Sequence, residues 1–194
     1  MMDIQDQIAA TAELCGAPLS KPALAMLALD LDAYPEQLVG AALRRCRMEH
    51  RGRLTAEAVI SRIDDGRPGP EEAWAMIPRD EQGSVVWTDE MAAAYGIASG
   101  LIAQGEPIAA RMAFLEHYRA AVAKARLGAL QPRWTPSLGW DARGREQVLQ
   151  EAADKGRLGH ENPLLLQCTG QTAHERSGMT RIGERVPAIG RDAP

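Results

Sequence analysis

Apolar residues recur every three or four positions through most of this 194-residue chain, and this spacing is the feature that most constrains its fold. The clearest run places Phe114, Tyr118, Ala121, Val122 and Ala125 on one helical face. No segment shows the alternation of apolar and polar residues that is typical of a half-buried strand. Aromatic residues make up only 4% of the chain, which favours helices packed through alanine and leucine over a β-sandwich. The predicted fold class is all-α.

Glycine and proline divide this helical pattern into two modules. The run at 64–70, Asp-Asp-Gly-Arg-Pro-Gly-Pro, cannot be helical because two prolines and two glycines interrupt it. We expect an N-terminal module of four helices at 1–64, a Gly/Pro linker at 65–69 and a C-terminal helical module of three to four helices at 70–158. Beyond these, the periodicity ends, and residues 159–194 are predicted to form a mostly disordered tail.

Helix starts and irregular segments can also be assigned from residue type. Asp3, Ser20, Thr55 and Thr88 each precede an apolar periodic run and are expected to cap a helix. Residues 84–87 are predicted to be extended or a loop, and residues 134–141 a Trp-rich turn. In the tail, Leu164, Leu165 and Leu166 form one apolar cluster, which predicts either a short helical turn or a peptide that orders on a partner.

The charge of the chain is small overall but unevenly distributed. The formal net charge is −4, with six acidic and one basic side chain in residues 1–40 and seven basic and four acidic in residues 41–69. The chain has no stretch of about 18 apolar residues, and its N-terminus is acidic where a signal peptide is basic. We therefore expect a cytoplasmic protein that does not bind membranes.

Arginines of the basic segment give the best electrostatic candidate site, which we call the arginine face. Its members are Arg44, Arg45, Arg47, Arg51, Arg53 and Arg62. Arginine suits phosphate recognition, so these residues are candidates for contact with nucleic acid, single-stranded DNA in particular. The alternative is a solvated surface that pairs with the acidic segments on either side.

Four tryptophans lie at or near predicted turns and form the second candidate site. They are Trp74, Trp87, Trp134 and Trp140. Tryptophan is enriched at the centres of protein interfaces, so these residues are candidates for binding a partner protein. The alternative is that they clamp helices together within the fold.

The sequence offers no set of residues suited to catalysis, to a metal or to another cofactor. Cys46 and His50 have the spacing of half a metal site, but no second pair accompanies them. Residues 66–70 resemble a phosphate-binding loop, yet they lack the Gly-Lys-Ser/Thr ending and follow no strand. Ser137 is not in a nucleophile elbow. The three cysteines are odd in number and widely spaced, which does not suit a disulfide framework, so we expect plain thiols. Because no catalytic residues can be nominated, we also expect a non-enzymatic protein.

Two parts of the chain resemble known phage proteins, over about residues 20–158. The first part runs from Leu24 to Ile63, with Leu27, Leu31-Asp32-Ala33-Tyr34-Pro35-Glu36, Val39, Ala42-Leu43, Cys46-Arg47, Arg53-Leu54-Thr55 and Ile60-Ser61-Arg62-Ile63. It resembles the N-terminal helical module of phage helicase loaders and loader/inhibitors. The second part, similar to uncharacterised proteins of proteobacterial prophages, contains Gly66 to Trp74, Val86 to Met91, Ala110 to Phe114 and Pro136 to Gly139.

This resemblance implies a phage or prophage accessory protein that acts in DNA replication. Its partner would be a hexameric replicative helicase, bound by one helical module, while the arginine face touches single-stranded DNA. Because an ATP-binding loop is missing, the resemblance is to loaders of the non-ATPase type. The alternative is a regulatory or inhibitory phage protein that binds a host protein complex without contacting DNA.

Overall fold

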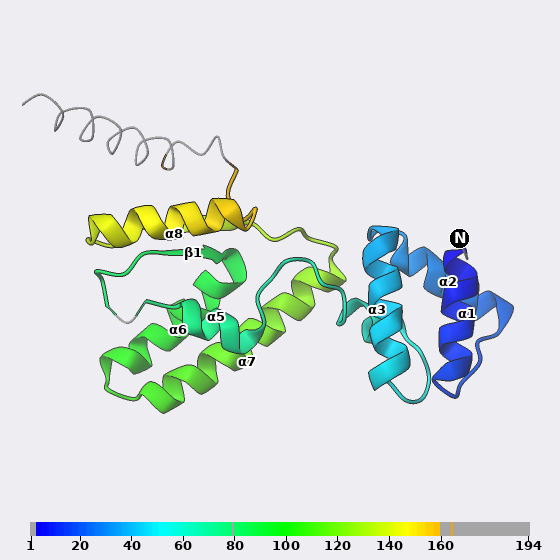
Figure 1. Ribbon diagram of the computed structural model, residues 1–194. Helices are drawn as coiled ribbons and strands as arrows, with labels where there is room; N and C mark the ends of the chain where they lie inside the picture. Colours follow the sequence, from blue (N-terminus) through cyan, green and yellow to red (C-terminus); the bar gives the residue numbers. More distant parts are fainter. Residues whose placement is uncertain (1–2, 79, 160–163, 165–194) are drawn as a thin grey trace, which may run out of the picture. The chain divides into compact units, whose positions relative to one another are not determined.

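The computed structural model describes residues 3–78, 80–159 and 164 of the chain. These residues form mostly helix, with eight helices and two short strands (Figure 1). Four of the helices precede residue 64: α1 (Ile4–Leu14), α2 (Lys21–Leu31), α3 (Glu36–Glu49) and α4 (Ala56–Ile60). The predicted helical character and the four helices of this part of the chain are confirmed.

The other helices are α5 (Pro70–Met76), α6 (Asp89–Ala103), α7 (Pro107–Leu127) and α8 (Ala142–Asp154). The two strands, β1 (Val85–Thr88) and β2 (Trp134–Ser137), pair into a small sheet. This small sheet is the exception to the predicted helical fold: 84–87 are predicted to be extended or a loop, as β1 is, whereas 134–141 are predicted to form a turn. Each strand is only four residues long, too short for an alternating pattern to be recognised in the sequence.

Side-chain caps start four of the helices where the sequence predicts them. Each capping oxygen accepts a hydrogen bond from a backbone N–H in the first turn, which satisfies a donor that has no partner inside the helix. The capping residues are Asp3 for α1, Ser20 for α2, Thr55 for α4 and Thr88 for α6. These local signals therefore fix the helix starts without help from tertiary packing.

The chain forms two compact units that differ from the predicted modules. Of the described residues, the first comprises 3–77 and 87–135, and the second comprises 78, 80–86, 136–159 and 164. Both sides of the predicted linker at 65–69 thus belong to the first unit, and Arg67 and Pro68 within that linker are buried. Whether residues 1–64 fold independently of the rest stays a prediction. Apart from Gly159 and Leu164, the predicted tail lies outside the described residues.

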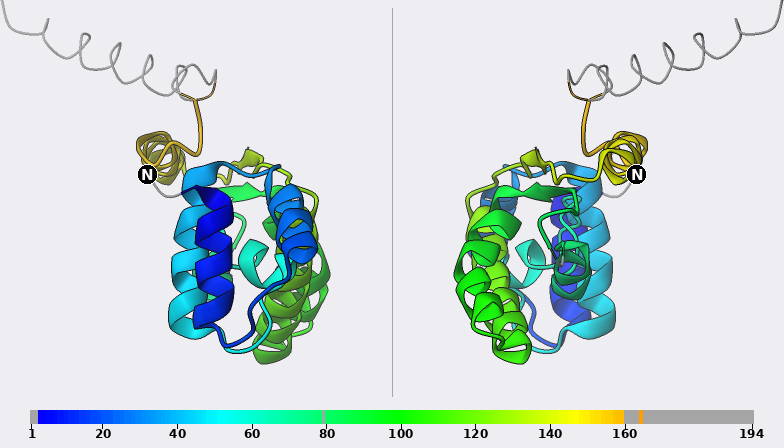
Figure 2. Two further views of the ribbon diagram at one scale, coloured as in Figure 1. Left: turned by 90° about the vertical axis from the view of Figure 1, so that its right-hand side faces the viewer. Right: turned by 90° about the vertical axis from the view of Figure 1, so that its left-hand side faces the viewer.

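The first unit contains two clusters of buried apolar side chains. One is shared by the four helices α1, α2, α3 and α4, and within it α1 and α3 lie side by side (Figure 2). Its fully buried members include Ile8, Ala12, Val39 and Leu43. The other joins α5 to the hairpin of α6 and α7, and it buries Phe114, Tyr118 and Val122 of the predicted α7 face.

The second unit is built on α8 and two loops, at 80–84 and 138–141. Leu149, Ala152 and Ala153 are the buried residues of α8. Asp141 caps the helix by accepting hydrogen bonds from the N–H groups of Arg143 and Gly144. The cap joins the 138–141 loop directly to the first turn of α8.

Among the described residues, no helix combines the length and apolarity that crossing a bilayer requires.

Candidate functional site

Two members of the arginine face are tied to carboxylates. Arg45 Nη2 lies 3.4 Å from Asp64 Oδ2, and Arg62 Nε lies 3.3 Å from Glu49 Oε2. Arg45 also donates a hydrogen bond to the backbone oxygen of Arg62 at 3.1 Å. These two arginines are therefore paired, as the alternative expects, but their partners Glu49 and Asp64 belong to the basic segment itself and not to the acidic segments on either side.

Two further members make hydrogen bonds within the fold. Arg47 donates a hydrogen bond of 2.7 Å to the hydroxyl of Thr11, a fully buried residue of α1. Arg51 donates to the backbone oxygen of His50 at 2.9 Å, just past the C-terminal end of α3, where unpaired carbonyls favour a cation. A nucleic acid would have to compete with these internal contacts.

Arg44 and Arg53 remain as the uncommitted cations of the arginine face. Both are exposed, and neither side chain has a hydrogen bond or ion pair within the described part of the chain. Met48, which lies on the same helix as Arg44, is also exposed, at 73%. The prediction that the arginine face binds nucleic acid is not tested by this arrangement, but only these two residues are free to bind phosphate without a structural cost.

Three of the four tryptophans are half-buried. Trp74 packs on Phe114 with ring centroids 5.2 Å apart, and Trp87 packs on Tyr95 at 5.6 Å. Trp134 lies in β2. These two ring pairs belong to the apolar cluster that joins α5 to α6 and α7, and they stabilise it. Trp74 and Trp87 therefore clamp helices together within the fold, as the alternative expects.

Trp140 differs from the other tryptophans because 80% of its surface is exposed. It precedes the cap of α8, in the 138–141 loop. A large aromatic side chain left in water is unfavourable, since its burial is the main source of its interaction free energy. An exposed tryptophan at a fixed position is therefore a candidate anchor for a partner.

Backbone hydrogen bonds fix the position of Trp140. The N–H of Trp140 donates to the oxygen of Glu81 at 3.3 Å, and the N–H of Asp141 donates to the oxygen of Gln82 at 3.2 Å. The N–H of Gly139 donates to the hydroxyl of Ser84 at 2.9 Å. Three consecutive amides thus hold the 138–141 loop against the 80–84 loop.

Gly139 allows this close approach of the two loops. A Cβ at this position would lie 2.2 Å from the backbone oxygen of Gln82 and 2.4 Å from that of Gly83. Neither oxygen can move away without opening the loop, because both belong to the backbone. The position therefore accepts only glycine.

An open hollow lies beside Trp140. Its volume is about 640 Å³, and its walls are formed by Asp80, Glu81, Gln82, Trp140 and Asp141. We call these five residues the Trp140 surface. It combines an exposed ring with three carboxylates and is held in place by the paired loops.

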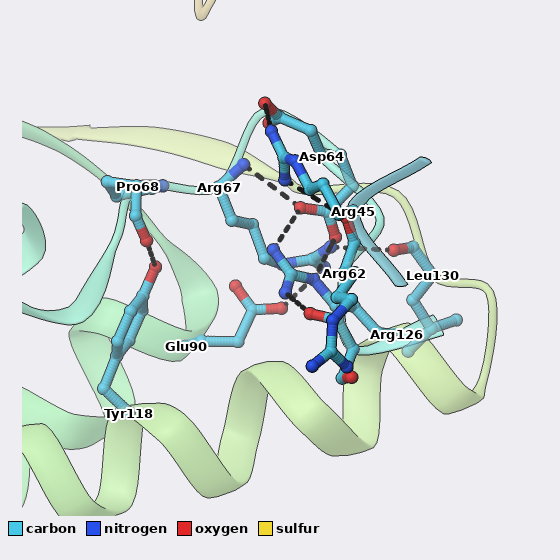
Figure 3. A network of polar contacts seen from close by, with 11 residues as sticks. Arg45, Arg62, Asp64, Arg67, Pro68, Glu90, Tyr118, Arg126 and Leu130 are labelled. Carbon is cyan, nitrogen blue, oxygen red and sulfur yellow. Dashed lines mark hydrogen bonds and ion pairs between the residues drawn. The ribbon is translucent and has the colours of Figure 1, made fainter. Parts of the chain in front are cut away.

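The structure also contains a buried charge network that sequence reasoning missed (Figure 3). Arg67, predicted as part of a linker, is only 6% exposed. Its Nη1 lies 2.5 Å from Asp65 Oδ2 and its Nη2 lies 2.8 Å from Glu90 Oε1. Nη1 also donates to the backbone oxygen of Leu130 at 3.1 Å. One guanidinium therefore ties the 65–69 segment to α6 and to the chain after α7.

Arg126 of α7 extends the network. Its guanidinium donates to both carboxylate oxygens of Asp65, at 3.1 and 3.2 Å, and to the backbone oxygen of Ser61 at 3.0 Å. Its own backbone oxygen accepts a hydrogen bond from the hydroxyl of Tyr34. The hydroxyl of Tyr118 points to the oxygen of Pro68 and donates to it at 2.8 Å (Figure 3).

The electrostatics of the network are those of mutually neutralised charges. Burial alone would raise the pKa of Asp65, but hydrogen bonds and charge from Arg126 and Arg67 outweigh it and hold that pKa below its ordinary value. Burial alone would also raise the pKa of Glu90, but the hydrogen bond from Arg67 acts in the opposite direction, and the pKa of Glu90 lies below its ordinary value. Because each carboxylate is already held by a guanidinium, we assign the network a structural role.

We expect the free energy of unfolding to fall when the pH drops below about 4. The pKa values of Asp65 and Glu90 are lower in the folded chain than in the unfolded chain. Their contribution is therefore complete above the unfolded-state values and is lost as the pH falls through the folded-state values. Urea unfolding at a series of pH values measures this.

The variant Asp65→Asn should show a shallower fall in acid than the parent, and Glu116→Gln, which changes an exposed carboxylate on α7, should follow the parent. An equal acid dependence in the parent and Asp65→Asn would show that Asp65 does not contribute.

Cys15, Cys46 and His50 are each placed by contacts within the first unit. Cys15 and Cys46 are buried free thiols, and burial raises the pKa of Cys46. The Nε2 atom of His50 is 3.1 Å from the backbone oxygen of Arg53. Within residues 3–78, 80–159 and 164, no three His, Cys, Asp or Glu side chains are grouped so that they could hold a metal ion. Cys168 lies outside these residues.

Comparisons with known proteins give no relative: no family model matches the chain, and no curated protein or solved structure shows significant similarity to it.

Proposed function

We propose that this chain is a non-enzymatic phage or prophage accessory protein that acts in DNA replication by binding a partner protein through the Trp140 surface. A replicative helicase is the first candidate partner. The alternative partner is another host protein complex, bound for regulation or inhibition without contact to DNA. Both readings share the same physical requirement, a preformed protein-binding surface on a small helical scaffold.

The observation that carries the proposal is the exposure of Trp140 on a rigid loop. Interface anchors are enriched in tryptophan, and a partner that buries this ring gains the free energy of removing it from water. Because three backbone amides already fix the loop, little conformational entropy remains to be lost on binding. Trp140 is therefore favoured over the three half-buried tryptophans as the binding residue.

The choice of a helicase rests on the resemblance of residues 24–63 to the helical module of phage loaders. The test is whether the purified chain forms a complex with a bacterial replicative helicase, measured by size-exclusion chromatography with light scattering. We expect a complex with the parent chain and its loss with Trp140→Ala. If a helicase never binds but another replication or regulatory protein does, the alternative partner takes its place.

A second function, contact with single-stranded DNA, is favoured by the two uncommitted cations Arg44 and Arg53. Replacing both with alanine should weaken binding to single-stranded DNA and lower the slope of log affinity against log salt by about 1.4, because each phosphate contact contributes about 0.7. Fluorescence anisotropy with labelled oligonucleotides at several salt concentrations measures both quantities.

The matched control removes two arginines elsewhere, Arg119→Ala with Arg143→Ala. Both are exposed, and neither side chain has a hydrogen bond or ion pair within the described residues. An equal loss in the control would mean that only net charge matters. Absence of binding by the parent chain at physiological salt would favour the protein-only alternative.

A further inference from the structure

The Trp140 surface has a chemical character that specifies what it binds. We propose that it binds an arginine side chain presented by an exposed basic segment of the partner protein. This inference rests on the proposed function, because it names the group that the partner brings to Trp140. Three properties of the surface carry it: its charge, its aromatic ring and its rigid geometry.

Among the residues that the structure describes, the charged side chains that line the hollow are all acidic. They belong to Asp80, Glu81 and Asp141. Asp80 accepts hydrogen bonds from the N–H groups of Gln82 and Gly83, and Asp141 caps α8, so both carboxylates are held in fixed positions. The side chain of Glu81 is exposed and has no hydrogen bond or ion pair within the described residues. Its carboxylate is free to pair with an incoming cation.

The aromatic ring adds a second attraction for the same kind of group. A cation over the face of tryptophan is attracted by the ring quadrupole, and tryptophan is the best of the aromatic side chains in this role. Arginine fits a ring beside carboxylates better than lysine does. Its planar guanidinium can stack on the ring and still direct N–H groups to a carboxylate.

A cation close in sequence to the hollow, Arg145, is engaged elsewhere. Arg145 of α8 donates a hydrogen bond from its Nη2 to the backbone oxygen of Gly139, at 2.9 Å, and this contact joins α8 to the 138–141 loop. Its side chain is half-buried and does not line the hollow. The hollow, of about 640 Å³, is open to solvent, so a side chain can enter it without rearrangement of the two loops.

The test uses a fluorescein-labelled tetra-arginine peptide as the probe and anisotropy as the readout. Trp140→Leu and Glu81→Gln should each weaken its binding about two- to fivefold, and the double variant about tenfold. Glu81→Gln leaves the fold intact, since this side chain makes no contact that the fold needs. The control Glu116→Gln removes another exposed carboxylate, from α7, and should leave the affinity unchanged.

Three results would overturn the inference: no binding of tetra-arginine by the parent chain, equal binding by all variants, or stronger binding of tetra-glutamate. Measuring how the same variants affect the complex with the partner protein then distinguishes a failure of this inference from a failure of the proposed function. If Trp140→Leu weakens the complex and Glu81→Gln does not, the arginine inference is wrong and the proposed function stands. If neither variant weakens the complex, the proposed function is wrong as well.

Discussion

Replacing Arg67 with methionine is expected to lower the free energy of unfolding by about 3–5 kcal/mol. Methionine keeps much of the length of the side chain but removes its charge. Asp65 would keep Arg126 as a partner, whereas Glu90 would lose the guanidinium that compensates its burial. The cost arises because a buried carboxylate without a counter-charge must either stay ionised at a high free-energy cost or take up a proton.

The matched control is Arg111→Met. Arg111 pairs with Glu71 on the surface of the first unit, and their side chains are 44% and 60% exposed. Surface pairs of this kind contribute less than about 1 kcal/mol. Chemical denaturation of both variants measures the difference. Equal unfolding free energies for the two variants would contradict the structural role of the network.

Gly139→Ala should produce the second large effect, a loss of about 1–3 kcal/mol or more together with loss of partner binding. The added Cβ would meet two backbone oxygens at distances far below van der Waals contact. The 138–141 loop must then separate from the 80–84 loop, which breaks the hydrogen bonds that hold Trp140. Urea unfolding and a binding measurement on the same sample test both consequences.

The control for this change is Gly100→Ala, in the exposed part of α6. A Cβ there would have no neighbour within 4 Å, and alanine is the better helix former by about 1 kcal/mol. The same chemical substitution should therefore stabilise the chain slightly and leave partner binding unchanged. Destabilisation by Gly100→Ala that equals the effect at Gly139 would contradict the steric explanation.

The parts of the fold that the sequence predicts well are those decided locally. The apolar stripe of α7 and the cap at Thr88 depend on residues within a few positions of one another. Such signals survive in any tertiary arrangement, which is why the helices lie where the spacing places them.

The buried network could not be predicted because its partners are distant in sequence. Arg67 meets Glu90, 23 positions away, and Asp65 meets Arg126, 61 positions away. Only the Gly66 and Pro68 neighbours of Arg67 mark its position, and they indicate an irregular segment without saying that it is buried. A charged residue in such a segment is usually solvated.

The candidate sites show the same limit. The sequence alone makes all four tryptophans and all six members of the arginine face candidates, but whether each side chain is exposed depends on how the helices pack. Packing half-buries Trp74 and leaves Trp140 in water, and it commits Arg47 to Thr11 while leaving Arg44 free. The sequence therefore proposes a set of residues, and the tertiary contacts reduce it to a few.

The most direct test of the proposed function is oxidative footprinting of the chain with and without its partner, read by mass spectrometry. Trp140 and Met48 are both exposed and oxidisable, and they report separately on the Trp140 surface and on α3, which carries three of the six residues of the arginine face. We expect the partner to reduce oxidation of Trp140 and to leave oxidation of Met48 unchanged. Protection of Met48 with no change at Trp140 would contradict the proposed binding surface.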